Sequence, residues 1–180
     1  ISVDTYLSTY RDWRDTSLWP TSSKESQIRL DAAKKQGNPL EKKGLLGAFC
    51  RSYSITEAIQ KFLPEVYAPT QHEDRYTYTE GSSVAGLAIY DNDTFAYSNH
   101  ATDPISGKLV NAFDLVRIHL FGAEDADVDP RTKITDLPSY KAMLDFVNKD
   151  GAAPILLDKE RMADMEFEDI TDEEEDFREK

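Results

Sequence analysis

The sequence predicts an α+β domain in which a small antiparallel sheet of about three strands packs with several helices. Three stretches in the middle of the chain, residues 75–79, 85–90 and 94–97, place apolar residues with the period of two that is typical of strands. Helix signals flank these stretches. Ser22 and Ser54 are each followed three residues later by Glu, which is the capping-box pattern that begins a helix.

The N-terminal part predicts helices that do little packing. A short helix is expected over residues 3–13, followed by a linker at 14–20, with Trp13 just before the linker and Leu18 and Trp19 in it. The helix that begins at Ser22 should run to about residue 35 and end at Gly37-Asn38-Pro39. Because it is polar on most faces, we expect it to connect rather than to pack.

Two further helices, over residues 40–52 and 55–63, each have an apolar face. Two short helices joined by a tight turn resemble a helix-turn-helix. The second helix would present Thr56, Glu57, Gln60 and Lys61, which is a weak set for contacting phosphate, so packing is favoured over DNA recognition.

The alternation in the three strands predicts one apolar face made of Tyr76, Tyr78, Leu87, Ile89, Phe95 and Tyr97, and a second face of small residues made of Gly86, Ala88 and Ala96. Residues 91–93 (Asp-Asn-Asp) predict a hairpin turn, since these residue types tolerate positive φ. A polar loop over 98–108 follows, and Asn111 should cap a helix that runs to Phe121.

The chain divides by composition into four parts. Residues 1–39 form an N-terminal helical and linker segment, and residues 40–122 form the α+β core. Residues 123–163 form an acidic linker with C-terminal helices, among them an amphipathic helix over 137–149. Residues 164–180 form an acidic tail with ten acidic residues in seventeen, which we expect to be mobile.

Charge and cysteine content narrow the class of protein. The net charge is −13, yet residues 1–120 hold 13 Lys and Arg against 15 Asp and Glu, so a local nucleic-acid site in that part is compatible with the charge.

Cys50 is the single cysteine, which fits a reducing, cytoplasmic location. The sequence has no apolar run of membrane-spanning length. Its first residue is Ile1 rather than Met, which fits a segment of a larger protein.

Catalytic patterns are missing from the sequence. It contains no Gly-x-x-x-x-Gly-Lys-Ser/Thr loop for nucleotide hydrolysis. The carboxylates of Asp91, Asp93 and Asp103 favour turn chemistry over a two-metal site. The possible zinc ligands, namely Cys50, His72, His100 and His119, do not have the spacing of ligand pairs. We therefore expect no catalytic residue, metal or cofactor in this segment.

Residues 85–122 resemble the zinc-ribbon domain of bacterial DNA primases, in which two strands, a Cys-x-x-Cys loop and a glycine lead into a helix of the type Asn/Asp-Ala-hydrophobic-Asp. Here residues 98–101 (Ser-Asn-His-Ala) occupy the place of the cysteine loop, and residues 111–114 (Asn-Ala-Phe-Asp) match the helix. With no cysteine present, the resemblance implies that packing holds the loop in place of metal.

A second resemblance covers some 140 residues. Short sequence motifs along the chain are similar to the middle region of phage and prophage primase–helicase proteins of the virulence-associated protein E family. These motifs are Asp12-Trp13-Arg14-Asp15-Thr16, Gly47-Ala48-Phe49-Cys50-Arg51, Phe62-Leu63-Pro64, Arg75-Tyr76, Phe95-Ala96-Tyr97-Ser98, His100-Ala101-Thr102-Asp103-Pro104 and Asn111 to Arg117.

This resemblance implies DNA replication, and an accessory, non-catalytic module between a primase domain and an ATPase (helicase) domain. The expected role is contact with a single-stranded template or coupling of those domains, with single-stranded DNA and the adjoining domains as partners and no membrane. The phosphate-facing residues would be Arg75, His100, Lys108, Asn111 and Arg117.

Two alternatives stay open. Tyr76, Tyr78, Phe95 and Tyr97 can stack on single-stranded bases, or pack beneath the helix that begins at Asn111, and the alternation with Leu87 and Ile89 favours packing. The whole chain can also be a protein–protein interaction or oligomerisation module without nucleic-acid contact, which the acidic C-terminal third favours.

Overall fold

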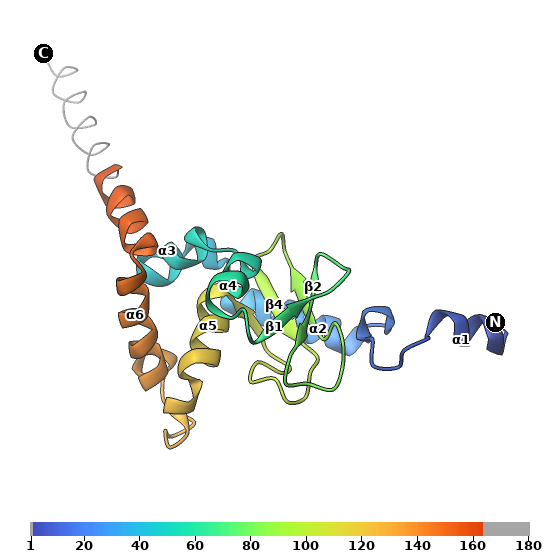
Figure 1. Cartoon of the computed structure of the whole chain (residues 1–180). Helices are drawn as coiled ribbons and strands as arrows, with labels where there is room; N and C mark the ends of the chain where they lie inside the picture. Colours follow the sequence, from blue (N-terminus) through green and yellow to red (C-terminus); the bar gives the residue numbers. More distant parts are fainter. Residues whose placement is uncertain (1, 164–180) are drawn as a thin grey trace, which may run out of the picture.

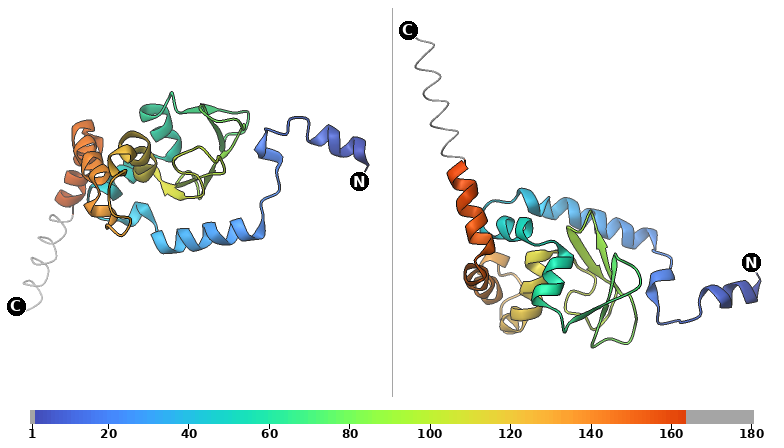
Figure 2. Two further views of the ribbon diagram at one scale, coloured as in Figure 1. Left: turned by 90° about the horizontal axis from the view of Figure 1, so that it is seen from below. Right: turned by 45° about the horizontal axis from the view of Figure 1, so that its top comes forward.

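The computed structural model describes residues 2–163, which form one antiparallel sheet with helices on both of its faces (Figures 1 and 2). The α-helices are α1 Val3–Thr9, α2 Ser23–Gln36, α3 Gly44–Ser52, α4 Ile55–Phe62, α5 Ala112–Phe121 and α6 Pro138–Asp150, and residues 152–163 are helical too. The strands are β1 Tyr67–Pro69, β2 Arg75–Tyr78, β3 Leu87–Tyr90, β4 Phe95–Ser98 and β5 Leu109–Asn111. Four 3-10 turns join them: η1 Thr16–Leu18, η2 Pro39–Glu41, η3 Gly122–Asp125 and η4 Ile134–Asp136.

The predicted α+β class and the antiparallel sheet are confirmed, but the sheet has five strands instead of about three. The strands follow one another in chain order from β1 to β5. The two strands that the sequence did not predict, β1 and β5, form the edges and have three residues each. A period of two is not recognisable over so short a stretch.

Local helix signals are reproduced. Ser54 and Glu57 form both hydrogen bonds of a capping box at the start of α4, and Asn111 caps α5 by accepting from the Asp114 N–H. Two boundaries differ from prediction. The first helix ends at Thr9 instead of residue 13, and the helix expected from residue 40 begins at Gly44, whose φ of 75° separates it from η2. The acidic tail at 164–180 lies outside the described residues.

The sheet register divides the predicted aromatic stripe between two faces. Tyr76 pairs with Leu87, and Ile89 pairs with Ala96, so these four share a face. Tyr97, however, pairs with Ala88. The prediction that Phe95 and Tyr97 lie beside Tyr76 and Tyr78 is therefore wrong. The turn at 91–94 sets Tyr90 opposite Phe95, and this places Phe95 and Tyr97 on the opposite face.

The hydrophobic core lies on the face that carries Tyr76 and Leu87. There α5 packs against β4 and β5, and α3, α4 and α6 pack against α5. Phe113 of α5 is fully buried and meets Phe49 of α3 edge to face, at 6.0 Å between ring centroids. All residues of this core, including those partly buried at its margin, lie between Leu45 and Leu157. Residues before η2 contribute nothing to it.

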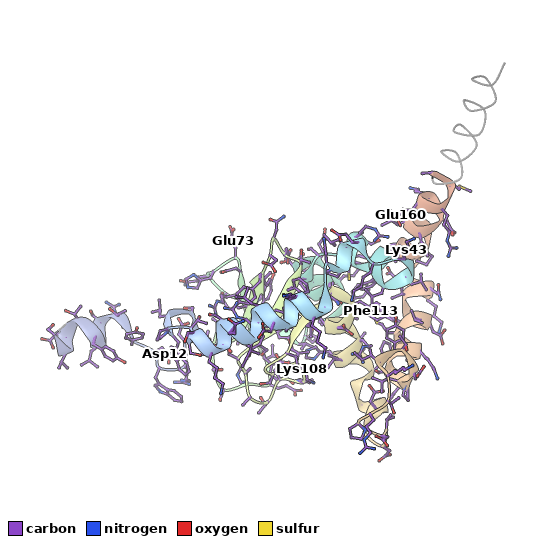
Figure 3. All side chains as sticks on the ribbon, turned by 180° about the vertical axis from the view of Figure 1, so that it is seen from behind. Asp12, Lys43, Glu73, Lys108, Phe113 and Glu160 are labelled. Atoms are coloured by element: carbon purple, nitrogen blue, oxygen red, sulfur yellow. The ribbon has the colours of Figure 1, made fainter. Side chains whose placement is uncertain are left out.

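The second sheet face lies under α2. Figure 2 (left) shows α2 on the side of the sheet opposite to α4, and Figure 3 shows it running across the sheet from behind. None of its fourteen residues is buried. The polar sequence of α2 thus gives a helix that lies on the sheet without entering the core.

The first segment projects from the rest of the chain. We call residues 2–21 the N-terminal arm; it contains α1 and η1 and extends away from the sheet (Figure 1). No residue of α1 is buried. Within the described residues, none of the helices has the length and hydropathy required to cross a membrane.

Candidate functional site

The most enclosed group of polar side chains lies between β1, the 98–108 loop and α5. The Tyr67 hydroxyl donates to the Asp103 carboxylate at 2.8 Å and lies 2.8 Å from His119 Nε2. His119 Nε2 is 3.4 Å from the other carboxylate oxygen, and the His119 and Asp103 side chains are 4% and 0% exposed. The Tyr67 hydroxyl, both Asp103 oxygens and His119 Nε2 therefore have partners inside the protein.

Hydrogen bonding keeps the Asp103 carboxylate ionised. Burial raises its pKa, but hydrogen bonds from His119, the Ile105 N–H, Ser98 and Tyr67 outweigh burial and hold the pKa below 3.8. Burial, together with the Asp103 charge, raises the pKa of the Tyr67 phenol. A closed, fully paired cluster of this kind stabilises the fold, since an unpaired carboxylate at the same place would be costly.

The same carboxylate organises the 98–108 loop. Asp103 accepts from the Ile105 N–H at 3.0 Å, and Ile105 is fully buried. The Gly107 N–H donates to the Ser98 carbonyl at 2.9 Å, which closes the base of the loop. Packing and hydrogen bonds therefore hold this loop in place.

His100 connects this loop to the 79–86 loop and, through it, to the N-terminal arm. The Ser83 N–H donates to His100 Nε2 at 3.0 Å, so this nitrogen is the unprotonated one of the ring. A methyl group at Gly81 would lie 2.1 Å from the imidazole, which shows how closely the loop covers it. Val84, which follows Ser83 in this loop, attaches the N-terminal arm. Its N–H donates to the Arg14 carbonyl at 2.7 Å, and its carbonyl accepts from the Thr16 N–H at 3.0 Å.

Three of the five residues predicted to face phosphate are buried. His100 is 4% exposed, Asn111 0% and Arg117 6%. Arg117 donates to Asp114 at 2.9 Å and to Ser139 at 2.7 Å, and thus joins α5 to α6. Asn111 donates to Gln36 at 2.9 Å and caps α5. These three side chains connect elements within the protein and are not part of an outer edge.

The other two, Arg75 and Lys108, differ in their relation to the second sheet face. Arg75 pairs across the sheet with Ala88, which pairs with Tyr97, which pairs with Leu109. Residues paired in this way share a face, so Arg75 stands at one end of a row that includes Tyr97. Lys108 is exposed and directly precedes Leu109 (Figure 3), but its ammonium group donates to the Pro104 carbonyl of its own loop at 3.1 Å. Arg75 therefore borders this face, whereas Lys108 belongs to the 98–108 loop.

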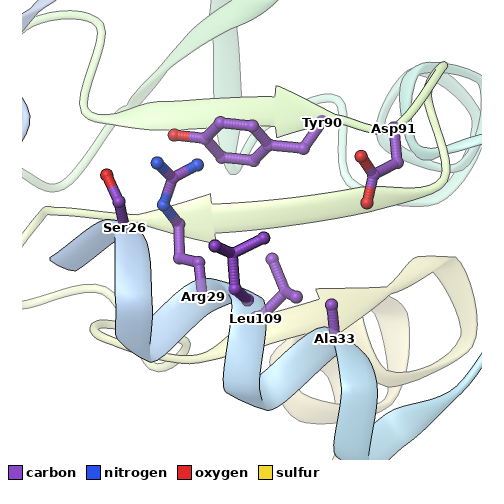
Figure 4. A pocket seen from close by; sticks show the side chains of 7 residues that line it. Ser26, Arg29, Ala33, Tyr90, Asp91 and Leu109 are labelled. Atoms are coloured by element: carbon purple, nitrogen blue, oxygen red, sulfur yellow. The ribbon is translucent and has the colours of Figure 1, made fainter. Parts of the chain in front are cut away.

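Tyr90 and Arg29 meet on that face. The Arg29 guanidinium lies 4.1 Å from the centroid of the Tyr90 ring (Figure 4). A pocket of about 190 Å³ remains between α2 and the sheet, with Ser26, Ala33 and Leu109 in its lining. Arg29 Nε is buried there without a hydrogen-bond partner. Burial also raises the pKa of Tyr97. Of the two charged residues of α2 that act on this phenol, Glu25 raises the pKa further and Arg29 lowers it.

Cys50 and the three histidines are the remaining candidates for thiol and metal chemistry. Burial raises the pKa of Cys50 to about 11, so its thiol is protonated at neutral pH. Among residues 2–163 no three or more His, Cys, Asp or Glu side chains are placed so that they could hold a metal ion. His72 lies in the exposed 70–74 loop, apart from the buried His100 and His119.

The trio of Tyr67, Asp103 and His119 was missed by sequence reasoning. Tyr67 lies in a strand too short to show alternation. For His119 a signal existed, since it follows the fully buried Leu115 by four residues and so lies on the inward face of α5. Comparisons with models of protein families, with curated proteins and with solved structures find no match to this chain.

Proposed function

We propose that the chain is an accessory, non-catalytic module of a phage-type DNA primase–helicase, and that it couples the neighbouring domains of that protein through its N-terminal arm. The observation that carries the coupling role is the exposure of large apolar side chains on the arm. Val3 and Trp13 are each 73% exposed, Leu7 is 60% and Trp19 is 52%. Several large apolar side chains exposed on one short segment indicate a surface that contacts another protein.

The attachment of the arm supports the same role. Backbone hydrogen bonds join the arm to Val84, which lies in the 79–86 loop that covers His100. A partner that binds the arm would therefore act directly on the 79–86 loop and on the sheet next to it. The polar clusters described above hold elements of this domain together, which fits a non-catalytic role.

Both tryptophans of the chain, Trp13 and Trp19, lie in the arm, so their fluorescence reports on its environment. We expect their emission to shift to shorter wavelength, and iodide quenching to fall, when the purified primase or ATPase domain of the parent protein is added. Tryptophans that stay fully quenchable with both domains would refute the coupling role.

Substitution should locate the contact. Trp13→Ala should weaken the association with the adjoining domain and leave the melting temperature of the isolated chain unchanged, because Trp13 packs against nothing in the core. Ile155→Ala removes another exposed apolar side chain, 58% exposed in the C-terminal helix, and serves as the matched control that keeps the association.

The second candidate is a protein–protein interaction or oligomerisation module with no direct nucleic-acid contact, and the same apolar arm favours it. Light scattering over a concentration series separates the two. Self-association that protects Trp13 and Trp19, with no response to the adjoining domains, would favour this candidate.

A further inference from the structure

A second binding surface lies hidden under α2. We propose that α2 is a removable cover over an aromatic sheet face, and that this face, when uncovered, stacks the bases of single-stranded nucleic acid. The inference concerns a different surface from the arm and does not depend on the coupling role.

The side chains of this face suit stacked bases. Tyr97 lies in one cross-strand row, and Tyr90 and Phe95 lie opposite each other in the next. Aromatic rings on a pleated sheet present flat surfaces that stack on bases whatever their sequence. In the closed form, the Arg29 guanidinium lies over the Tyr90 ring, 4.1 Å from its centroid, where a base would lie (Figure 4).

Charge differs between the two rows of the face. Arg75 stands at one end of the row that contains Tyr97. Asp91 lines the pocket at the hairpin end, next to Tyr90. Because a cation attracts phosphate and a carboxylate repels it, the backbone of the bound nucleic acid should lie on the Arg75 side of the face and leave the hairpin end free.

α2 lies on the surface of the sheet and, unlike the helices on the other face, places no residue in the core, although it leaves Phe95 and Tyr97 beneath it only 5% and 7% exposed. None of its residues is buried, and Ile28 and Leu30 are 47% and 65% exposed. The pocket of about 190 Å³ separates its middle from the sheet, and a cavity of about 470 Å³ lies beside its C-terminal end at Lys35 and Gln36.

The contacts that hold α2 are few and polar. They include the Arg29–Tyr90 stack and the hydrogen bonds of Gln36 with Asn111 and with the Leu109 carbonyl. Arg29 Nε is left without a partner. Since no core residue precedes Leu45, α2 can leave the sheet without opening the core.

The experiment compares open and locked forms of the full chain. Ala33→Pro interrupts α2 without removing a cation, because proline breaks a helix interior. Ala33→Cys combined with Leu109→Cys should lock α2 to β5 when oxidised, since the two positions line the same pocket. The probe is a labelled oligothymidylate of about 12 nucleotides, followed by fluorescence anisotropy across a salt series.

We expect the Ala33→Pro chain to bind about tenfold tighter than the unmodified chain, and the oxidised double-cysteine chain about tenfold weaker, with recovery on reduction. In the Ala33→Pro background, Tyr97→Leu should weaken binding about tenfold, because it removes a stacking surface. The control Tyr6→Leu removes an exposed aromatic from the arm instead and should change nothing. The single Ala33→Cys chain is the control for the oxidation step.

Three outcomes would overturn the inference. Open and locked chains that bind alike would show that α2 covers nothing relevant, and a loss with Tyr6→Leu but not with Tyr97→Leu would move the site to the arm. An Ala33→Pro chain that self-associates in light scattering and binds no oligonucleotide would make the uncovered face a protein interface. Tryptophan quenching of the arm reports on the coupling role separately, so failure of one proposal is distinguishable from failure of the other.

Discussion

The Tyr67 hydroxyl donates to the Asp103 carboxylate at 2.8 Å, and this bond joins the first strand of the sheet to the loop that precedes the last. The two residues are thirty-six positions apart, and both are almost completely buried. Together with His119 they tie β1, the 98–108 loop and α5 into one unit. The stability of the loop should therefore depend on the charge of Asp103.

Asp103→Asn should lower the free energy of unfolding by about 2 kcal/mol, because the hydrogen bonds to this carboxylate are charge-assisted and buried. Urea unfolding measures the change. Asp158→Asn is the matched control, since that carboxylate is 71% exposed and its ion pair with Arg161 is long, at 3.8 Å. Equal stabilities of the two variants would show that the trio contributes nothing.

Acid should destabilise the protein partly through Asp103. Its pKa in the folded protein lies below 3.8, so its contribution is complete above that pH and is lost as the pH falls through the folded value. Asp150 acts in the same direction. Burial raises its pKa, but the hydrogen bonds from Lys61 and Tyr53 outweigh burial and lower it. Unfolding free energy plotted against pH should fall less steeply below 3.8 for Asp103→Asn than for the unmodified chain. Parallel curves would assign the acid sensitivity to other groups.

Gly81→Ala should destabilise the 79–86 loop, since the added methyl group would lie 2.1 Å from the buried His100 ring. A loss of about 1–3 kcal/mol is typical of such overpacking, and thermal unfolding measures it. Gly122→Ala is the control: its φ of −59° suits alanine, and the nearest heavy atom, on Ile118, is 3.7 Å from the new methyl group. A Gly81→Ala chain as stable as the control would mean that the loop moves aside at no cost.

Glu160→Ala should loosen the C-terminal helix. Arg51 donates to both carboxylate oxygens of Glu160, at 2.7 and 2.5 Å, and this pair links α3 to helical residues 152–163. Because both side chains are partly exposed, we expect a loss of about 1 kcal/mol, seen as faster amide exchange over residues 152–163. Arg161→Ala, in the same helix but with an exposed ion pair, should leave the exchange rates unchanged.

Cys50 should be inert in the folded chain. With a pKa of about 11 and a side chain buried against α5, it presents almost no thiolate at pH 8. Its reaction with a thiol-specific reagent should become fast only when urea unfolds the protein. Rapid labelling under native conditions would show that α3 opens locally.

Much of the local structure followed from the sequence, because its causes are local. The capping box of Ser54 and Glu57 and the Asn111 cap act within three residues of each helix end. Asp91, Asn92 and Asp93 all take positive φ, between 51° and 65°, as the residue types at the hairpin turn indicated. The site residues were harder to predict, since a basic or polar residue type does not reveal which partner it meets.

The sequence by itself determined the fold class, the helix starts capped by Ser22, Ser54 and Asn111, and the central hairpin, all of which depend on residues adjacent in the chain. Only the tertiary structure decided which residues face outward. Arg117 is buried, and its guanidinium donates a hydrogen bond to the hydroxyl of Ser139, twenty-two residues later. Tyr97 lies under α2 instead of in the core because a single hairpin register determines the face of every residue in β4. Local sequence patterns do not show which distant segments pair, or which register a hairpin turn sets. Pairing and register decide where the cations and aromatic rings of the second sheet face lie.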